Sequence, residues 1–264
     1  MTGPAPAKIN LALVVGPTRD DGKHELVTVY QRLDLADRIT VEPADVTRVE
    51  GFAEDTIVRA ALEVLGAPHG WRVRISKKIP VAAGLGGGSS DAATALRLAN
   101  AQLDEPRPLD ELAARVGADV PFFLHDGPQL GTGDGTTLEP VDLPQDFVVL
   151  LLLPHGARKE STASVYAAFD ERGGEAGFDE RAAALRDALA RVRRPRDLAA
   201  LPPNDLVSSP LAGELLTQGA FRADVSGAGP IVYGLFHGVA EAKRARRALR
   251  RHGRFWVTIP AWYG

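Results

Sequence analysis

The chain has 264 residues, of which 45% are hydrophobic, and a formal net charge of −3 at pH 7. This length supports either one large hydrophobic core or two modest ones, and we expect two domains. The small net charge offers no global electrostatic attraction to nucleic acid or to an anionic membrane. Because the sequence contains no cysteine, disulfide bonds and thiolate metal sites are excluded.

The longest apolar block, Phe147 to Pro154, is far too short to cross a membrane as a helix. The segment Met1 to Ala7 lacks the cationic stretch of a secretory signal. We therefore expect a cytoplasmic protein with no membrane partner.

The first half of the chain alternates between patterns typical of strands and of helices. Ile9, Leu11, Leu13 and Val15 alternate with other residues at the period of a half-buried strand, which predicts that Lys8 and Asn10 share its polar face. The following patterns predict strands over 38–42 and 71–76 and helices over 55–65, 90–101 and 109–116. Since Gly117 is a natural helix stop, Asp119 should lie in the turn after the last of these helices.

The second half begins with an apolar run over 148–153 that predicts a buried strand, and we place a domain boundary near residue 150. The two predicted domains are residues 1–150 and 151–264. Within the second we expect helices over 161–170, 180–193 and 241–252, and strands over 231–236 and 255–259. This mixture of elements predicts an α+β fold.

A glycine-dense loop lies between the predicted strand at 71–76 and the helix from 90, and it comprises Pro80, Val81, Ala82, Ala83, Gly84, Leu85, Gly86, Gly87, Gly88, Ser89 and Ser90. Glycine leaves backbone amides open to a bulky anion, and the N-terminus of the next helix attracts the same anion. Ser89 and Ser90 are candidates to cap that helix. The loop matches neither a Walker A motif nor the dinucleotide pattern. A phosphate-binding loop is favoured over a flexible turn, because a merely structural turn seldom contains so much glycine.

This loop resembles the ATP-binding motif of the GHMP kinases, a family of small-molecule kinases. Five further segments resemble the same family in order and spacing, namely 6–11, 21–26, 117–123, 204–206 and 226–230. The resemblance is strongest to the branch that phosphorylates a cytidine diphosphate-linked polyol of the non-mevalonate isoprenoid route. It implies a two-domain fold, with an N-terminal domain like domain 2 of ribosomal protein S5, a ferredoxin-like C-terminal domain and an active site in the cleft between them. It also implies ATP with Mg²⁺, and no metal site built by the protein alone.

Phosphoryl transfer to an alcohol needs a cation near the transferred group and a carboxylate to orient or deprotonate the hydroxyl. The resemblance implies that Lys8 and Asp119 fill these roles. Taken singly, Lys8 reads as a charge on a strand surface and Asp119 as a turn former. The apolar residues 120–123 that follow Asp119 favour a cationic partner for it.

The resemblance also implies residues that contact the two substrates. Thr56 and Ile57 would lie near adenine, although the family usually has asparagine at the first of these positions. The residues implied to contact the phosphate acceptor are Asn10, Lys23, His24, Thr162, Tyr166, Ser226 and Gly227. Lys23 replaces the tyrosine that stacks on cytosine in the family. Tyr166, four residues after Thr162 on a predicted helix, can supply an aromatic ring instead or can be a core residue.

Three interpretations follow from these residues. The first is the kinase for the cytidine diphosphate-linked polyol, and the second is a GHMP kinase for another small alcohol, favoured by Lys23. The third is a non-catalytic nucleotide-binding protein, which the presence of both Lys8 and Asp119 disfavours. The arginine-rich segment 243–251 predicts a solvated helix face rather than a nucleic-acid surface. We therefore expect small-molecule partners and leave the oligomeric state open.

Overall fold

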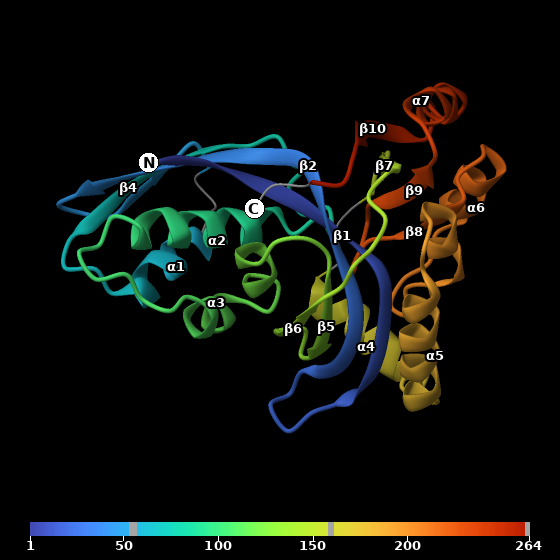
Figure 1. The fold of residues 1–264 in the computed structure, drawn as a ribbon, viewed down its shortest axis with the longest axis horizontal. Helices are drawn as coiled ribbons and strands as arrows, with labels where there is room; N and C mark the ends of the chain where they lie inside the picture. The colour runs from blue at the N-terminus through green and yellow to red at the C-terminus, as the bar shows by residue number, and fades with distance from the viewer. Residues whose placement is uncertain (53–56, 158–160, 262–264) are drawn as a thin grey trace.

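The computed structural model describes residues 1–52, 57–157 and 161–261. These residues form two β-sheets with helices packed against them (Figure 1), which confirms the predicted α+β fold. The strand order of the first sheet is β3-β4-β2-β5-β6, with β1 paired to β2, and that of the second is β10-β7-β9-β8. Within the described ranges, no helix combines the length and the apolar character needed to cross a membrane.

The first sheet and its helices come from the N-terminal part of the chain. Its strands are β1 (Thr2–Thr18), β2 (His24–Ala44), β3 (Arg48–Glu50), β4 (Gly70–Ser76), β5 (Gln129–Gly133) and β6 (Thr137–Pro140). The helices are α1 (Ile57–Leu65), α2 (Gly87–Asn100), α3 (Asp110–Val116) and the 3₁₀ turn η1 (Pro121–Leu124). Helix α2 packs on β1 and β2, and α1 packs on α2. Large apolar side chains such as Trp71, Phe122 and Leu96 fill the space between the sheet and these helices.

The second sheet is built from β7 (Val148–Pro154), β8 (Arg222–Val225), β9 (Val232–Phe236) and β10 (Gly253–Thr258). Its helical elements are α4 (Thr162–Glu171), α5 (Phe178–Arg191), η2 (Pro195–Ala200), α6 (Pro210–Thr217) and α7 (Val239–Ala248). Neighbouring strands are antiparallel. The spatial order places the fourth strand beside the first and the third beside the second, which is the ferredoxin-like arrangement that the family resemblance implies.

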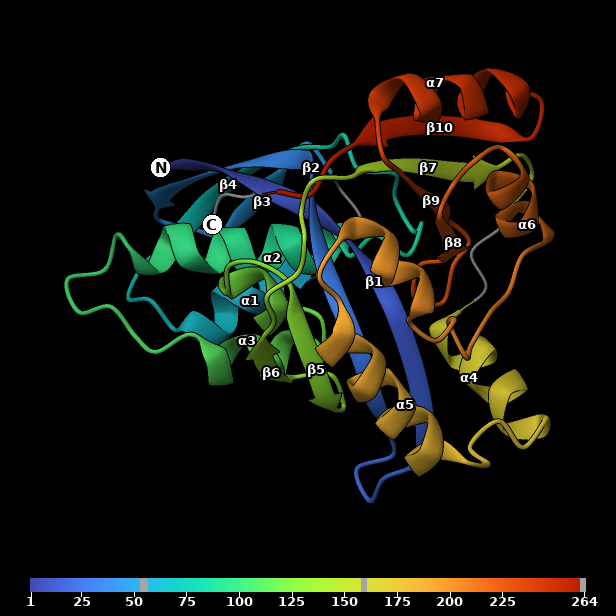
Figure 2. The same cartoon turned by 45° about the vertical axis from the view of Figure 1, so that its right-hand side comes forward.

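The two sheets share one hydrophobic cluster. Helix α5 lies across β1 (Figure 2), and Leu185 packs in a cluster with Leu11 of the first sheet and Tyr233 of the second. The end of the described chain returns to the first sheet, where the amide of Ala261 donates to the carbonyl of Arg32. The division into domains 1–150 and 151–264 therefore stays a prediction, and β7 begins just before that boundary.

Three local predictions need correction. Strand β1 is not half-buried, because α2 covers one part of it, α5 another, and residues 5–16 are all buried. Helix α2 begins at Gly87, not Ser90, and follows Gly86 in the left-handed region with φ 68°, so neither Ser89 nor Ser90 caps it. Helix α7 ends at Ala248 instead of His252, because the chain must turn back to pair β10 with β7.

Candidate active site

A cleft of about 970 Å³ opens beside the glycine loop, between β1, the β1–β2 hairpin and α4. Most of the residues singled out in the sequence line it, namely Lys8, Asn10, Lys23, His24, Ile57, residues 80–89, Asp119, Thr162, Tyr166 and Gly227. These residues come from segments more than 200 positions apart in the chain. A cavity of this size with convergent polar groups is typical of a small-molecule site.

Among the described residues singled out in the sequence, two do not line the cleft. Ser90 and Ser226 are fully buried behind its wall, and Thr56 lies outside the described residues. The Ser226 hydroxyl donates to the Gly84 carbonyl at 3.0 Å and accepts from the Asn10 amide at 3.3 Å. Ser226 therefore ties the glycine loop to β1, at the back of the site.

The glycine loop is held by close backbone packing. Gly84 has φ +83°, and a Cβ atom there would lie 2.4 Å from the Ser226 carbonyl oxygen. Gly86 has φ +68°, and its Cβ would lie 2.9 Å from the Phe123 ring. At Gly87 the nearest atom to a Cβ would be Ile79 Cγ2 at 3.1 Å. These glycines are thus required by the fold of the loop itself, and the loop presents the amides at the N-terminus of α2 to the cleft, where an anion is favoured.

A buried ion cluster anchors the entry to this loop. Lys77 Nζ lies 2.5 Å from Asp37 Oδ2 and 2.8 Å from Asp91 Oδ2, and both carboxylates are fully buried. Burial lowers the pKa of Lys77, but the two carboxylates outweigh burial and the net pKa is raised, so this lysine is charged at neutral pH. Asp37 also accepts hydrogen bonds from the amides of Lys78 and Ile79. The cluster therefore connects β2, β4 and α2 just before the loop begins.

Lys8 and Asp119 meet at the centre of the cleft. Lys8 Nζ lies 3.3 Å from Asp119 Oδ2 and donates to Asn10 Oδ1 at 2.7 Å. The Lys8 side chain is only 4% exposed, whereas that of Asp119 is 33% exposed. Asn10 in turn donates to Thr28 Oγ1 at 2.8 Å, which fixes the orientation of its amide. The geometry thus leaves the carboxylate open to the cleft and holds the ammonium behind it.

Tyr30 completes this centre and was missed by reasoning from the sequence. Its hydroxyl donates to Asp119 Oδ1 at 3.2 Å, and Lys8 Nζ lies 5.3 Å from the centre of its ring. Burial, followed by the charge of Asp119, raises the pKa of the Tyr30 hydroxyl well above its usual range. The pairing of strands β1 and β2 is the information that would have identified Tyr30, because Tyr30 lies opposite Asn10 in their register.

The hairpin end of the cleft carries an aromatic pair and an ion pair. The His24 and Tyr166 rings have centroids 4.7 Å apart, and His24 Nε2 lies 2.8 Å from Asp170 Oδ1. Lys23 Nζ lies 2.5 Å from Asp134 Oδ2, in the turn between β5 and β6. The lysine therefore points to a carboxylate and does not lie against the aromatic pair.

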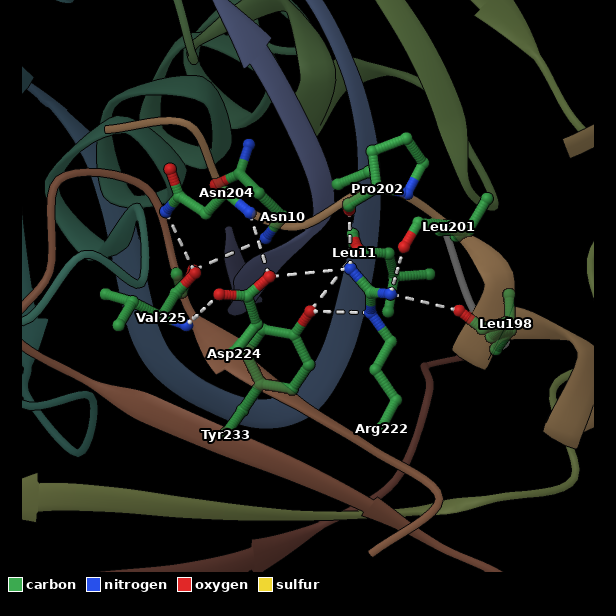
Figure 3. A network of polar contacts seen from close by, with 12 residues as sticks. Asn10, Leu11, Leu198, Leu201, Pro202, Asn204, Arg222, Asp224, Val225 and Tyr233 are labelled. Carbon is green, nitrogen blue, oxygen red and sulfur yellow. Dashed lines mark hydrogen bonds and ion pairs between the residues drawn. The ribbon is translucent and has the colours of Figure 1, made fainter. Parts of the chain in front are cut away.

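A buried polar network that includes Asn204, Arg222 and Asp224 (Figure 3) holds the loop at 226–229 in place. The Asn204 side chain donates to the Val225 and Gly227 carbonyls at 3.0 and 2.7 Å. The backbone amide of Asn204 donates to Asp224 Oδ2 at 2.9 Å. Arg222 binds the carbonyls of η2 and of the following residues, and its Nη2 lies 3.5 Å from Asp224 Oδ2. Burial raises the pKa of Asp224, and Arg222 opposes this. Asn204 therefore positions the loop at 226–229.

Comparison with known proteins finds relatives that match most of the chain. Residues 55–127 match the family model described as the GHMP kinases N terminal domain. The chain is 39% identical to the 4-diphosphocytidyl-2-C-methyl-D-erythritol kinase of Anaeromyxobacter sp. (strain Fw109-5), over 93% of this chain and 85% of that protein.

Two solved structures have the same fold. A crystal structure of 4-(cytidine 5'-diphospho)-2C-methyl-D-erythritol kinase matches with a TM-score of 0.78 and 35% identity, over 99% of this chain and all of that one. A crystal structure of mevalonate kinase matches with a TM-score of 0.71 over 98% of this chain and 99% of that one. At 14% identity the second structure supports the fold alone.

Proposed function

The chain belongs to the 4-diphosphocytidyl-2-C-methyl-D-erythritol kinase family of the GHMP kinases, and from this premise we propose that it transfers the γ-phosphoryl group of ATP to the 2-hydroxyl of 4-diphosphocytidyl-2-C-methyl-D-erythritol. The observation that carries the proposal is the Lys8–Asp119 ion pair, which faces the same cleft as the glycine loop. A phosphate-binding loop and an exposed carboxylate in one cavity are the parts that phosphoryl transfer to an alcohol needs.

In this mechanism the residues have separate tasks. The amides at the start of α2 bind the ATP phosphates and hold the γ-phosphoryl group toward the centre of the cleft. Asp119 accepts a hydrogen bond from the acceptor hydroxyl, orients it and takes its proton as the new O–P bond forms. The bond between the γ-phosphorus and the β–γ bridging oxygen breaks in the same step, and ADP leaves. Lys8, buried behind Asp119, holds that carboxylate through the ion pair and offsets negative charge on the transferred group. Most of the rate enhancement would come from positioning and electrostatics.

ATP is the phosphoryl donor that this family implies, and we propose that Mg²⁺ enters with it. In the described part of the chain, no group of three or more His, Cys, Asp or Glu could hold a metal ion by itself. Mg²⁺ in phosphoryl-transfer sites is commonly held by one or two carboxylates together with substrate phosphates. When bound, the ion would neutralise phosphate charge during transfer.

The hairpin end of the cleft is proposed to bind the cytidine diphosphate. Tyr166 and His24 form an aromatic pair on which a base can stack, and Thr162 lies on the same face of α4 as Tyr166. Lys23 cannot replace the ring of a tyrosine, but its ammonium can contribute positive charge near a diphosphate. Ile57, at the start of α1, lines the cleft on the nucleotide side.

The second candidate is a kinase for a different small alcohol, and Lys23 is the observation that favours it. A panel of alcohols tests both candidates by ADP release with ATP and Mg²⁺, using 4-diphosphocytidyl-2-C-methyl-D-erythritol, homoserine, mevalonate and sugars. The proposal expects turnover of the cytidine compound, with that turnover lost in Asp119→Asn. Turnover of another alcohol alone would support the second candidate. An absence of turnover with every alcohol, in a protein that still binds ATP, would support a non-catalytic nucleotide-binding protein.

A further inference from the structure

The side chain of Tyr30 occupies an unusual place at the centre of the cleft. It is 2% exposed, its hydroxyl donates to Asp119 Oδ1 at 3.2 Å, and its ring faces Lys8 Nζ at 5.3 Å. Lys8 contacts the other carboxylate oxygen, Oδ2, at 3.3 Å. The two oxygens of Asp119 are therefore held by two different elements, β1 through Lys8 and β2 through Tyr30.

The ring of Tyr30 is fixed by its neighbours. Phe122 lies against it with ring centroids 4.9 Å apart. A Cβ atom at Gly131 would lie 2.6 Å from Tyr30 Cε2, and one at Gly135 would lie 2.8 Å from its hydroxyl oxygen. Two glycines of the β5–β6 hairpin thus make the space that the ring and its hydroxyl occupy. A side chain confined on several sides holds its hydrogen bond without further loss of conformational entropy.

We propose that Tyr30 is a positioning residue for the reaction, and that its hydroxyl fixes the Asp119 carboxylate so that the acceptor alcohol approaches it in one orientation. The inference rests on the proposed function, which makes Asp119 the group that receives the alcohol proton. A carboxylate held by an ammonium on one oxygen alone can rotate about its Cβ–Cγ bond, and a second donor stops that rotation. Misplacement of a reacting group by a fraction of an ångström lowers the rate without weakening ground-state binding.

The charged and titratable groups around Asp119 come from four elements. Lys8 lies on β1 and Tyr30 on β2. The charge of Asp119 acts on the Tyr166 hydroxyl on α4, and Asp134 in the β5–β6 turn acts on the Tyr30 hydroxyl. Of these four, Lys8 and Tyr30 contact the carboxylate directly. The Tyr30 hydroxyl stays protonated across the working pH range, because burial and the charge of Asp119 both oppose its ionisation. It can therefore only donate to the carboxylate.

Tyr30→Phe tests the proposal, because it removes the hydroxyl and keeps the ring. A hydrogen bond to a charged group corresponds to a change of about 10- to 100-fold, so kcat should fall by that factor while KM for ATP stays within about twofold of its original value. A kcat loss without a matching change in KM is the signature of a misplaced reacting group, which a general loss of structure would not give. Tyr233→Phe is the matched control, because it removes another buried tyrosine hydroxyl outside the cleft, and its kcat should be unchanged.

Further measurements separate this inference from the proposed function and from a structural role. The Asp119 carboxyl carbon resonance, assigned with Asp119→Asn, reports the surroundings of that carboxylate without any substrate, and its chemical shift should change in Tyr30→Phe even if the cytidine compound proves not to be the substrate. Tyr30→Leu removes ring and hydroxyl together and should be slower than Tyr30→Phe. An unchanged carboxyl resonance and kcat in Tyr30→Phe would overturn the inference. A fall in kcat that is fully explained by a smaller fraction of folded protein would also overturn the inference.

Discussion

Gly84→Ala is predicted to destabilise the protein more strongly than Gly88→Ala, a change in the first turn of α2. The added Cβ would lie 2.4 Å from the Ser226 carbonyl oxygen and 2.9 Å from that of Gly229, and both of these are backbone atoms that cannot rotate away. The residue also has φ +83°, which costs a residue with a Cβ about 1–2 kcal/mol. Overpacking adds about 1–3 kcal/mol, so the free energy of unfolding should fall by about 2–5 kcal/mol in total.

The same substitution should also open the back of the cleft. The Gly84 carbonyl accepts the Ser226 hydroxyl at 3.0 Å, so a shift of the loop breaks the link between residues 80–89 and the loop at 226–229. ATP affinity should therefore fall along with stability.

Gly88→Ala is the matched control for this prediction. Its Cβ would lie 3.5 Å from Ile57 Cδ1, an ordinary van der Waals distance, and Gly88 lies in α2 with no positive φ. Alanine is favoured over glycine in a helix by up to about 1 kcal/mol, so this variant should be as stable as the original or slightly more so. Urea unfolding of the three proteins measures the difference. Equal unfolding free energies for Gly84→Ala and Gly88→Ala would refute the reasoning.

Three further variants have predicted outcomes. Asp119→Asn should lower kcat by about 10²- to 10⁴-fold while ATP still binds by calorimetry, and unaltered turnover would remove Asp119 from the mechanism. Tyr166→Ala should raise KM for the cytidine substrate by the equivalent of about 1–3 kcal/mol in steady-state kinetics, an effect that added salt should not diminish. Burial raises the pKa of Asp134, but hydrogen bonds from Lys23 and Thr136 outweigh burial and lower the net pKa. The ionised carboxylate therefore stabilises the fold at pH values above the unfolded-state pKa of about 4. That contribution disappears as the pH falls through the lower pKa of the folded state. Lys23→Met should therefore be less stable by under about 1 kcal/mol at pH 7, and urea unfolding at lower pH should show the gap closing below about pH 4.

Periodicity in the sequence predicted much of the fold, but only where one face of an element is apolar. Strand β2 runs from His24 to Ala44, yet only 38–42 was predicted as a strand. The cause is the burial of polar residues along it, since Gln31 is bound by Gln145 and Arg32 by the carbonyls of η1 and His125. Such partners come from more than 90 positions away. No local pattern reveals them.

The sequence likewise predicted only part of the candidate site. The glycine loop was singled out by its residue types and local spacing, and Lys8 and Asp119 by the resemblance to the GHMP kinases. Tyr30, Asp134 and the partners of Lys77 were missed, because each acts through a contact between distant strands or turns. The register of paired strands decides which side chains lie opposite one another, and local sequence patterns do not reveal it.

The position of Lys23 follows from these contacts. Its ammonium is paired with Asp134 and its side chain is 54% exposed, so it contributes little to binding a neutral base. The ring of His24, by contrast, is 9% exposed and lies between Tyr166 and Asp170. The aromatic surface at this end of the cleft is therefore already assembled from β2 and α4, without a ring at position 23. We expect the recognition of the substrate to depend more on Tyr166 and His24 than on Lys23, with Lys23 acting through its charge on the diphosphate, an interaction that weakens as ionic strength rises.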